Sequence, residues 1–450
     1  MSDPIARGER FSVSPFYRVY VLALLVSVGI AGWVDRNVLA ALLQSIKVDL
    51  AFSDTELGLL GGVAFGLFYA TVGLPIAWLA DRSDRRSLIA AAVGLWSVMT
   101  AACGLAAGFT TLFLSRVGVG IGEAGGSPPS QSLVSDYFGP ERRARAFGVL
   151  YLQIPLGFVV GYWLGGWMDG LFGWRLTFLL VGLPGVALAI LVRLTLREPP
   201  RGHAEVVNAA ETPNPSLAAT IRFFITQPAL RYLALAGAAH GIGAFAAALW
   251  LPAYFIRTFA VTGATAGGWL ALAYGCGGTA GVLCGGQLAD ALVRNTKDAR
   301  WYAWGCSSVI AATLPCTALV YLADTPALAI AALVLTTLLG HMFLGPVTAL
   351  LQSLAGIRRR AMVAAFYLFL VNLVSMGLGP TAVGLASDAF AATLGNDALR
   401  WALFALVALA SALASGLFCV AARNVPRNLD HEGLVGTGRA LHSSSPAPAP

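Results

Sequence analysis

The chain has 450 residues, of which 57% are hydrophobic and 11% charged, with a formal net charge of +7. A water-soluble domain usually carries about 25% charged residues, so this composition excludes an ordinary soluble enzyme or regulatory domain. The basic residues lie in short clusters between apolar runs, unlike a nucleic-acid-binding stripe, and no nucleic-acid partner is expected. The composition predicts an all-α protein that crosses a lipid bilayer many times.

A membrane-spanning helix needs about 20 mostly apolar residues. Six windows of the N-terminal half meet this length: 17–45, 56–79, 87–107, 110–134, 143–168 and 174–194. Six windows of the C-terminal half do so: 229–256, 264–289, 301–322, 326–353, 361–388 and 398–422. The sequence therefore predicts twelve transmembrane helices in two bundles.

The segments outside these windows set the predicted domain boundaries. Residues 198–227 are polar and contain several prolines, which is typical of a linker. The C-terminal end, SSSPAPAP, is low in complexity and is predicted to be disordered. The predicted domains are an N-terminal six-helix bundle (1–197), a cytoplasmic linker (198–227), a C-terminal six-helix bundle (228–425) and a disordered cytoplasmic tail (426–450).

The orientation follows from the 29 Lys and Arg residues. With the N-terminus inside, most of them fall in the termini and the alternate loops that then face the cytoplasm. The densest clusters are Arg82/Arg85/Arg86, Arg142/Arg143/Arg145, Arg294/Lys297/Arg300 and Arg358/Arg359/Arg360. Because cytoplasmic loops of membrane proteins are enriched in basic residues, both termini are predicted to be cytoplasmic. The predominance of Arg (27) over Lys (two), with abundant Ala, favours a bacterial inner membrane.

The two halves resemble each other in sequence. Leu79-Ala80-Asp81 closes the second predicted span, and Leu288-Ala289-Asp290 closes the second span of the other half. Gln131-Ser132-Leu133 and Gln352-Ser353-Leu354 likewise precede corresponding basic loops. These matches indicate a duplicated bundle, and transporters built from such repeats bind substrate near the membrane midplane between the halves.

Two motifs resemble signatures of the major facilitator superfamily. Leu79-Ala80-Asp81-Arg82-Ser83-Asp84-Arg85-Arg86 is similar to its cytoplasmic Gly-x-Leu-Ala-Asp-Arg-x-Gly-Arg-Arg motif, with Ala77 and Asp84 in place of the two glycines. The run from Arg116 to Ala124, RVGVGIGEA, is similar to the superfamily's Arg-x-x-x-Gly-x-Gly-x-Ala pattern. The resemblance covers nearly the whole chain and implies a secondary transporter.

Three further features resemble the spinster branch of that superfamily. They are Asp35-Arg36-Asn37, Gly122-Glu123-Ala124 and the run from Asn372 to Pro380, NLVSMGLGP. This resemblance implies export of sphingolipid- or lysophospholipid-like substrates. It also implies proton coupling through acidic residues in the first and fourth helices.

The first predicted span has polar residues at its centre. Asp35, Arg36 and Asn37 follow one another within an otherwise apolar run. One charge at the centre of a bilayer costs about 2.5–3.5 kcal/mol on insertion scales. Such a cost predicts a function for these residues, and Asn37 is a candidate for substrate binding.

The fourth predicted span contributes Arg116 and Glu123. They lie seven residues apart and so share one face of the helix. With a rise of 1.5 Å per residue, Asp35 lies about 12 Å and Arg116 about 9 Å below the outer surface. A buried pair between Asp35 and Arg116 is therefore expected where the two helices face each other.

These four charged residues, Asp35, Arg36, Arg116 and Glu123, are predicted to couple transport to protons. Burial strengthens a carboxyl's hold on its proton and a neighbouring arginine weakens it, so a rearrangement of the pairs captures or releases a proton. The alternative is a static clamp between helices. Ionisable groups inside membranes usually mark pathways or relays, which favours coupling.

Other polar and aromatic residues are candidates for the wall of a central cavity. They are Gln153, Trp250, Tyr254, Tyr367 and Asn372. The alternative for the aromatic residues is packing or anchoring at the membrane interface. For His240, a hydrogen-bonded structural role is favoured over the alternative of a proton relay.

A cytoplasmic gate is predicted from the acidic residues that adjoin the basic loops. The resemblance implies that Asp81 pairs with Arg85 and Arg86, and Asp136 with Arg142 and Arg145. The alternative is that these arginines only set the orientation in the membrane, and both roles are compatible.

The predicted function is proton-coupled secondary transport of an amphipathic or lipid-like molecule by a monomer. The chain has no Gly-x-x-x-x-Gly-Lys-Ser/Thr motif for nucleotide binding, so the proton gradient is the expected energy source, without a cofactor or metal. The alternatives within transport are a multidrug exporter and an organic-anion symporter. A membrane enzyme or sensor is the remote alternative, because no catalytic constellation and no soluble domain is present.

Overall fold

The computed structural model describes residues 13–80, 82–200, 217–355 and 359–426. Every element in these ranges is helical. Most of the predicted linker and nearly all of the predicted disordered tail lie outside the described residues, as does Asp81.

The helices of the N-terminal half begin and end close to the predicted spans. They are α1 (Pro15–Leu50), α2 (Asp54–Gly61), α3 (Val63–Ala80), α4 (Arg85–Gly104), α5 (Phe109–Glu123), α6 (Ser127–Tyr137), α7 (Pro140–Tyr151) and α8 (Gln153–Thr195). Helix α8 contains most of the fifth predicted span and the whole of the sixth. The backbone turns between them at Gly173, which has φ 75°, a left-handed conformation that glycine adopts without a steric penalty.

The helices of the C-terminal half follow the same order. They are α9 (Leu217–Thr226), α10 (Pro228–Phe259), α11 (Gly263–Leu272), the π-helical η1 (Ala273–Gly278), α12 (Thr279–Thr296), α13 (Trp301–Leu322), α14 (Pro326–His341), α15 (Leu344–Ala355), α16 (Arg360–Leu394), the 3₁₀ turn η2 (Gly395–Asp397) and α17 (Ala398–Arg423). Helix α9 lies within the predicted linker and packs against α10 and α16, so that part of the segment belongs structurally to the C-terminal bundle.

Membrane crossing is supported by the length and composition of these helices. In the described ranges, eight helical stretches are long and apolar enough to span a bilayer. Two of them, Arg145–Thr195 and Met362–Arg423, have 51 and 62 residues, and about 20 residues suffice for one crossing. Each can therefore hold two crossings, and the count of twelve remains a prediction.

Several predicted spans are interrupted in the structure. The fourth span divides into α5 and α6, and at the break Gly125 and Gly126 donate to the carbonyls of Gly122 and Glu123, three residues back. Short stretches of 3₁₀ or π geometry inside a helix often accompany functional sites. Breaks also separate α2 from α3, α7 from α8 and α14 from α15.

Local sequence signals explain several helix starts. Ser14 accepts a hydrogen bond from the backbone N–H of Tyr17 at the start of α1, and Ser53 and Glu56 form a capping box at the start of α2. Asp84 caps α4 with φ −67°. The turn therefore accommodates a non-glycine residue where the superfamily motif has its second glycine.

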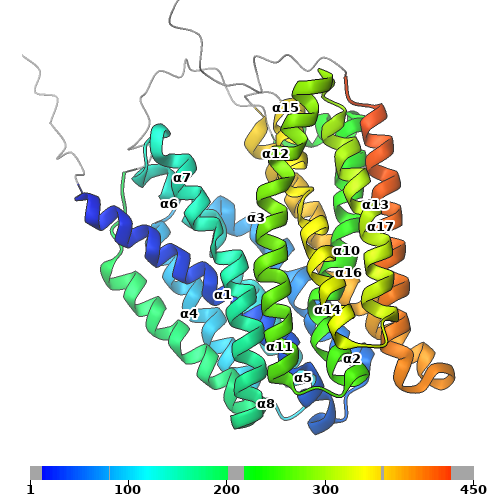
Figure 1. Ribbon diagram of the computed structural model, residues 1–450. Coiled ribbons are helices and arrows are strands. Elements are labelled where there is room, and N and C mark those ends of the chain that lie inside the picture. The colour runs from blue at the N-terminus through cyan, green and yellow to red at the C-terminus, as the bar shows by residue number, and fades with distance from the viewer. Residues whose placement is uncertain (1–12, 81, 201–216, 356–358, 427–450) are drawn as a thin grey trace, which may run out of the picture.

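The two halves meet most closely at one end of the molecule (Figure 1). This end lies away from the start of α1 and from the end of α17. A Cβ atom on Gly166 of α8 would lie 2.1 Å from the carbonyl oxygen of Gly263 at the start of α11. A Cβ on Gly384 of α16 would lie 2.2 Å from the oxygen of Asp54 in α2. These backbone contacts require glycine. We call this end of the molecule the closed end.

The apolar core has a matching distribution. One cluster of buried residues combines α1, α2 and α8 with α10, α13 and α17, and so joins both halves at the closed end. The other two clusters lie toward the chain ends, one almost wholly in each half. The halves thus share a core at the closed end and have separate cores at the opposite end.

Candidate functional site

The polar residues of α1, which are Asp35, Arg36 and Asn37, have different neighbours. Successive residues of an α-helix point about 100° apart, so Asp35 and Arg36 face different helices. Thr100 of α4 donates a hydrogen bond to Asp35 at 3.1 Å. Asn37 donates to the carbonyl of Trp33 at 2.7 Å and packs on Gly161 of α8.

Arg36 forms an ion pair with Glu123, the last residue of α5. The guanidinium Nε donates to Glu123 Oε2 at 2.6 Å, with side chains 18% and 3% exposed. The rings of Trp33, Phe65 and Tyr69 lie 4.7–4.9 Å from the guanidinium carbon, and cation–π contacts of this kind each contribute about 0.5–2 kcal/mol. The arginine is therefore held by one carboxylate and a cage of three aromatic rings.

The structure corrects the expected pair between Asp35 and Arg116. Arg116 of α5 is buried, and its guanidinium lies over the Phe65 ring at 5.1 Å. Among the described residues, its Nε and Nη1 have no hydrogen-bond partner, and neither does Glu123 Oε1. Asp35, Arg116 and Glu123 interact electrostatically, but Arg36 is the arginine that forms the ion pair with Glu123.

The Arg36–Glu123 pair lies on the wall of a cavity of about 140 Å³ in the N-terminal half. Gly29, Gly32 and Trp33 of α1 line one side, and Gln153, the first residue of α8, lines another. The Gln153 side chain fills the space beside Gly29, where a Cβ would lie 1.1 Å from its Oε1. We call this space the charged cavity. It joins Gln153 and the ion pair in one site.

The other cavity candidates lie elsewhere. Trp250 and Tyr254 of α10 are fully buried, and they donate to the carbonyls of Pro380 at 2.9 Å and Val320 at 2.8 Å. These two residues therefore pack between helices. Tyr367 is buried against Gly237, and Asn372 is half-buried on α16. None of the four lines the charged cavity.

The predicted gate residues include one buried network. Arg85 of α4 is 1% exposed, is paired with Asp136 of α6, and donates to Glu198 at 2.6 Å. It also donates to Ser132 and to the carbonyl of Pro199. Sequence reasoning had assigned Arg142 and Arg145 to Asp136 and had missed Glu198. This network joins α4 and α6 of the N-terminal half to the first two residues of the predicted linker.

The remaining described gate candidates are Arg86, Arg142 and Arg145. Arg86 is half-buried, pairs with Asp84 at 3.1 Å and donates its backbone N–H to Glu198, whereas Arg142 and Arg145 are exposed. Asp81 is outside the described residues. The expected Asp81 pairs therefore remain predictions.

A charged cluster at the closed end was missed by sequence reasoning. Asp54 of α2 is buried and accepts hydrogen bonds from Arg257 of α10 at 2.8 and 2.9 Å, and also from Lys47 and Ser387. Asp388 of α16 accepts from the backbone N–H groups of Asp54 and Thr55. We call this set the clasp, because it ties α1 and α2 to α10 and α16. No sequence pattern connects positions that are 203 to 334 residues apart.

Comparisons with known proteins agree with this architecture. A model of the Major Facilitator Superfamily matches residues 24–380. An MFS-type efflux pump from Mycolicibacterium smegmatis is 31% identical over 411 residues, which is 91% of this chain and 94% of the relative. Human protein spinster homolog 1 is 30% identical over 257 residues, which is 56% of this chain and only 48% of the human protein.

A solved structure extends the similarity to three dimensions. The crystal structure of a bacterial homologue of the human lysosomal transporter Spinster, inward-facing and unoccupied, superimposes with a TM-score of 0.83 and 28% identity, covering 92% of this chain and 98% of that chain. A hexuronate transporter from Bacillus subtilis is also similar, at 27% identity over 52% of this chain and 56% of the relative. The chain belongs to the Major Facilitator Superfamily and is a spinster-like, multi-pass secondary transporter rather than an enzyme.

Proposed function

We propose that this chain moves an amphipathic, lipid-like solute across a bacterial inner membrane in exchange or together with protons. The observation that carries the proposal is the unequal pairing at the charged cavity. Asp35, Arg36, Arg116 and Glu123 interact electrostatically with one another, yet one ion pair forms among them, and it lies on the cavity wall. In such an arrangement either carboxylate could pair with either arginine, and a proton-coupled switch requires such alternative pairs.

Glu123 is the proposed proton carrier. When ionised, it holds Arg36, and its second oxygen has no partner among the described residues. A proton on Glu123 removes the charge that holds the guanidinium. Arg36 then keeps its contacts with the three aromatic rings and lies next to Asp35 in the chain. The ion pair that joins α1 to α5 is lost. Arg116 supplies the second positive charge to whichever carboxylate is ionised.

The clasp is the proposed seal of the closed end. It joins the two halves through Asp54 and Arg257, and alternating access requires such a bond to form and break in each cycle. The distribution of arginines places this end outside and both termini in the cytoplasm, with twelve crossings in all. Because one chain contains both halves, a monomer suffices for the cycle.

The proposed substrate follows from the contrast between the halves. The charged cavity suits a charged or zwitterionic head, while a cavity in the C-terminal half is lined without Asp, Glu, Lys or Arg. A molecule with a charged head and an uncharged remainder fits both. Relatives named as hexuronate and L-galactonate transporters keep a small organic anion as the second candidate, since the free N–H groups of Arg116 could bind a carboxylate.

Purified protein in liposomes that contain a pH-sensitive dye would test the proposal. Lysolipids, sphingoid bases, drugs and hexuronate are added in turn under an imposed pH gradient. Proton movement driven by an amphipathic compound is the expected result. Proton movement driven only by hexuronate would support the organic-anion function instead. Solute flux without proton movement would contradict proton coupling.

A further inference from the structure

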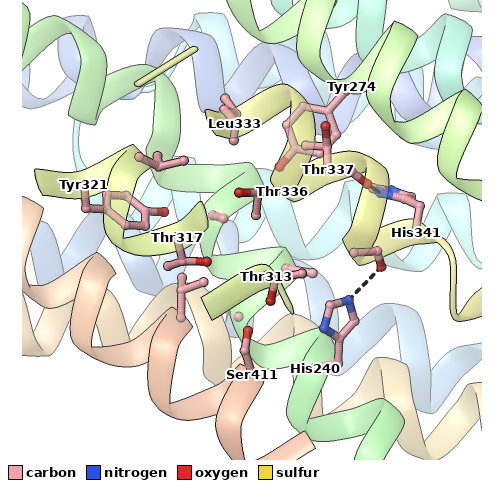
Figure 2. Close-up of a pocket in the computed structure, with 16 residues that line it drawn as sticks. His240, Tyr274, Thr313, Thr317, Tyr321, Leu333, Thr336, Thr337, His341 and Ser411 are labelled. Carbon is pink, nitrogen blue, oxygen red and sulfur yellow. Dashed lines mark hydrogen bonds between the residues drawn. The ribbon is translucent and has the colours of Figure 1, made fainter. Parts of the chain in front are cut away.

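A second cavity, of about 70 Å³, lies inside the C-terminal half (Figure 2). Its walls come from α10, η1, α13, α14 and α17, and its polar residues include His240, Thr317 and His341. We call it the uncharged cavity. Tyr274, on its wall, stacks face to face on Phe158 of α8, with ring centroids 4.6 Å apart. One wall of the cavity therefore borders the N-terminal half.

Both imidazoles offer a lone pair. Nε2 of His240 lies 3.0 Å from the carbonyl of Gly340, and Nδ1 of His341 lies 2.7 Å from the carbonyl of Thr337. A carbonyl only accepts hydrogen bonds, so each of these nitrogens carries the proton and the other ring nitrogen is an acceptor. Figure 2 shows the second nitrogen of His240 on the side of the Thr313 and Ser411 hydroxyls.

The threonines add more acceptors. Thr313, Thr336 and Thr337 each donate their hydroxyl hydrogen to a helix carbonyl at 2.6–2.9 Å. Their oxygens keep lone pairs that remain able to accept. The wall is thus rich in acceptors, and its donors are already occupied by the backbone at these three positions.

Two of the polar atoms are unsatisfied. In the part of the chain that the structure describes, Nδ1 of His240 and Oγ1 of Thr317 have no hydrogen-bond partner, and Thr317 is 1% exposed. Buried polar atoms without partners are costly, and in native proteins they often mark a missing ligand or water. The absence of charged residues from the wall excludes an ionic guest, because an unpaired buried charge is far more costly.

The broken helices supply a second, independent sign of a binding site. His341 is the last residue of α14, at the break before α15, and Tyr274 lies in the π-helical η1. Transporters of this kind often form their binding sites where membrane helices are discontinuous. The charged cavity shows the same feature at Glu123 and Gln153.

From these contacts we propose that the uncharged cavity binds an uncharged, hydroxyl-bearing group attached to a hydrocarbon chain. The hydroxyls donate to the imidazole and threonine acceptors, while Val320, Leu333 and Val407 contact the hydrocarbon. This inference rests on the proposed transport function and narrows its substrate to molecules with hydroxyl donors beside an apolar chain.

The test uses two uncharged probes, 1-O-octylglycerol and its dimethyl ether, which share a chain but differ in hydroxyl donors. Their binding to the full-length protein in lipid nanodiscs is measured by calorimetry, and ligand stabilisation by thermal unfolding. The wild-type protein is expected to bind octylglycerol about tenfold more tightly than the ether, from one or two added hydrogen bonds. Equal binding of the two probes would overturn the proposal.

The variant Thr317→Val is expected to weaken ligand binding without lowering the stability of the fold. The valine fills the same volume and breaks no hydrogen bond, so the unliganded protein should unfold at the same temperature or higher. Binding of octylglycerol should weaken about fivefold, and binding of the ether should not change. The matched control is Thr348→Val on α15, an exposed threonine that bonds its own helix. Equal weakening in both variants, or in neither, would contradict the site.

Glu123→Gln distinguishes this inference from the transport function. It removes the proposed proton carrier but lies outside the uncharged cavity. Octylglycerol should therefore bind this variant as it binds the wild type. Selective binding of octylglycerol without any proton-coupled transport would support the site and refute the coupling, while coupled transport without selective binding would do the reverse.

Discussion

The two cavities of this transporter differ in chemistry although they lie in halves of related sequence. The charged cavity has Arg36 and Glu123 on its wall, with Arg116 buried nearby. The uncharged cavity has two histidines and a set of hydroxyls, and no Asp, Glu, Lys or Arg. Both occur at helix breaks, so similar irregularities of the fold carry different side-chain chemistry in the two halves.

This difference underlies the division of labour that we propose. The N-terminal half buries charge, whose cost is offset by pairing and by aromatic rings, and it is proposed to handle protons. The C-terminal half has a cavity lined by uncharged groups, and it is proposed to recognise an uncharged group through hydrogen bonds. The clasp and the glycine contacts at the closed end connect the two halves, and we expect a change in one half to alter access to both cavities.

The largest expected effect is on coupling. Glu123→Gln keeps the size of the side chain but removes its charge, so the Arg36 ion pair is lost and no proton can be carried. We expect substrate-driven proton movement in liposomes to be abolished, with the protein still inserted and folded. Asp324→Asn, at an exposed carboxylate in the loop before α14, is the control and should retain full activity. Wild-type proton flux in Glu123→Gln would show that the charged cavity takes no part in proton coupling.

The second effect is on the clasp. Asp54→Asn leaves Arg257 and Lys47 without their carboxylate, and removing one partner of a buried pair costs about 3–5 kcal/mol. Even the lower value shifts a two-state equilibrium about 100-fold, toward the state that is open at this end. Spin labels at Val48 of α1 and Leu394 of α16, both exposed, would report the change as longer distances in a background without native cysteines.

The control for the clasp is Asp397→Asn. Asp397 is also acidic and at the same end, but its pair with Arg400 is long, at 3.8 Å, and its side chain is 58% exposed. Such surface pairs contribute about 0–1 kcal/mol, so the label distances should hardly change. If Asp54→Asn gives the same distances as this control, the clasp does not hold the halves together.

The third effect concerns backbone contact between the halves. Gly166→Ala would place a Cβ 2.1 Å from the oxygen of Gly263, and overpacking of this kind costs about 1–3 kcal/mol. The same pair of labels should then show a shift toward separation of about tenfold in population. Gly170→Ala, one turn further along α8, has no neighbour within 4 Å and should leave the distances unchanged. Identical behaviour of the two variants would show that this contact is dispensable.

The smallest effect is on substrate length. Each methylene that enters an apolar space contributes about 0.8 kcal/mol, or about fourfold in affinity, so binding of lysolipids should strengthen with chain length until the space is filled. Ala247→Leu on the wall of the uncharged cavity should lower the length at which this increase stops. Ala412→Leu, on the exposed side of α17, is the control. If the binding affinity did not change with chain length, a small polar anion would be favoured as the substrate.

The positions of the helices could be predicted from sequence alone, because a bilayer imposes a fixed length of apolar residues. The predicted windows 301–322 and 398–422 differ from α13 and α17 by at most one residue at their ends. The breaks within spans were not predicted. Hydropathy averages over about 20 residues, so a change of hydrogen-bond pattern over three or four residues, as at Gly125, leaves no trace in it.

The sequence by itself determined which residues carry charge inside the predicted spans, since this follows from composition and from the length of each apolar run. It therefore singled out Asp35, Arg36, Arg116 and Glu123. Only the tertiary structure decided that Arg36 holds Glu123 and that Asp54 meets Arg257. A pairing depends on how each helix is rotated about its axis against its neighbours, and side-chain packing over the whole bundle sets that rotation.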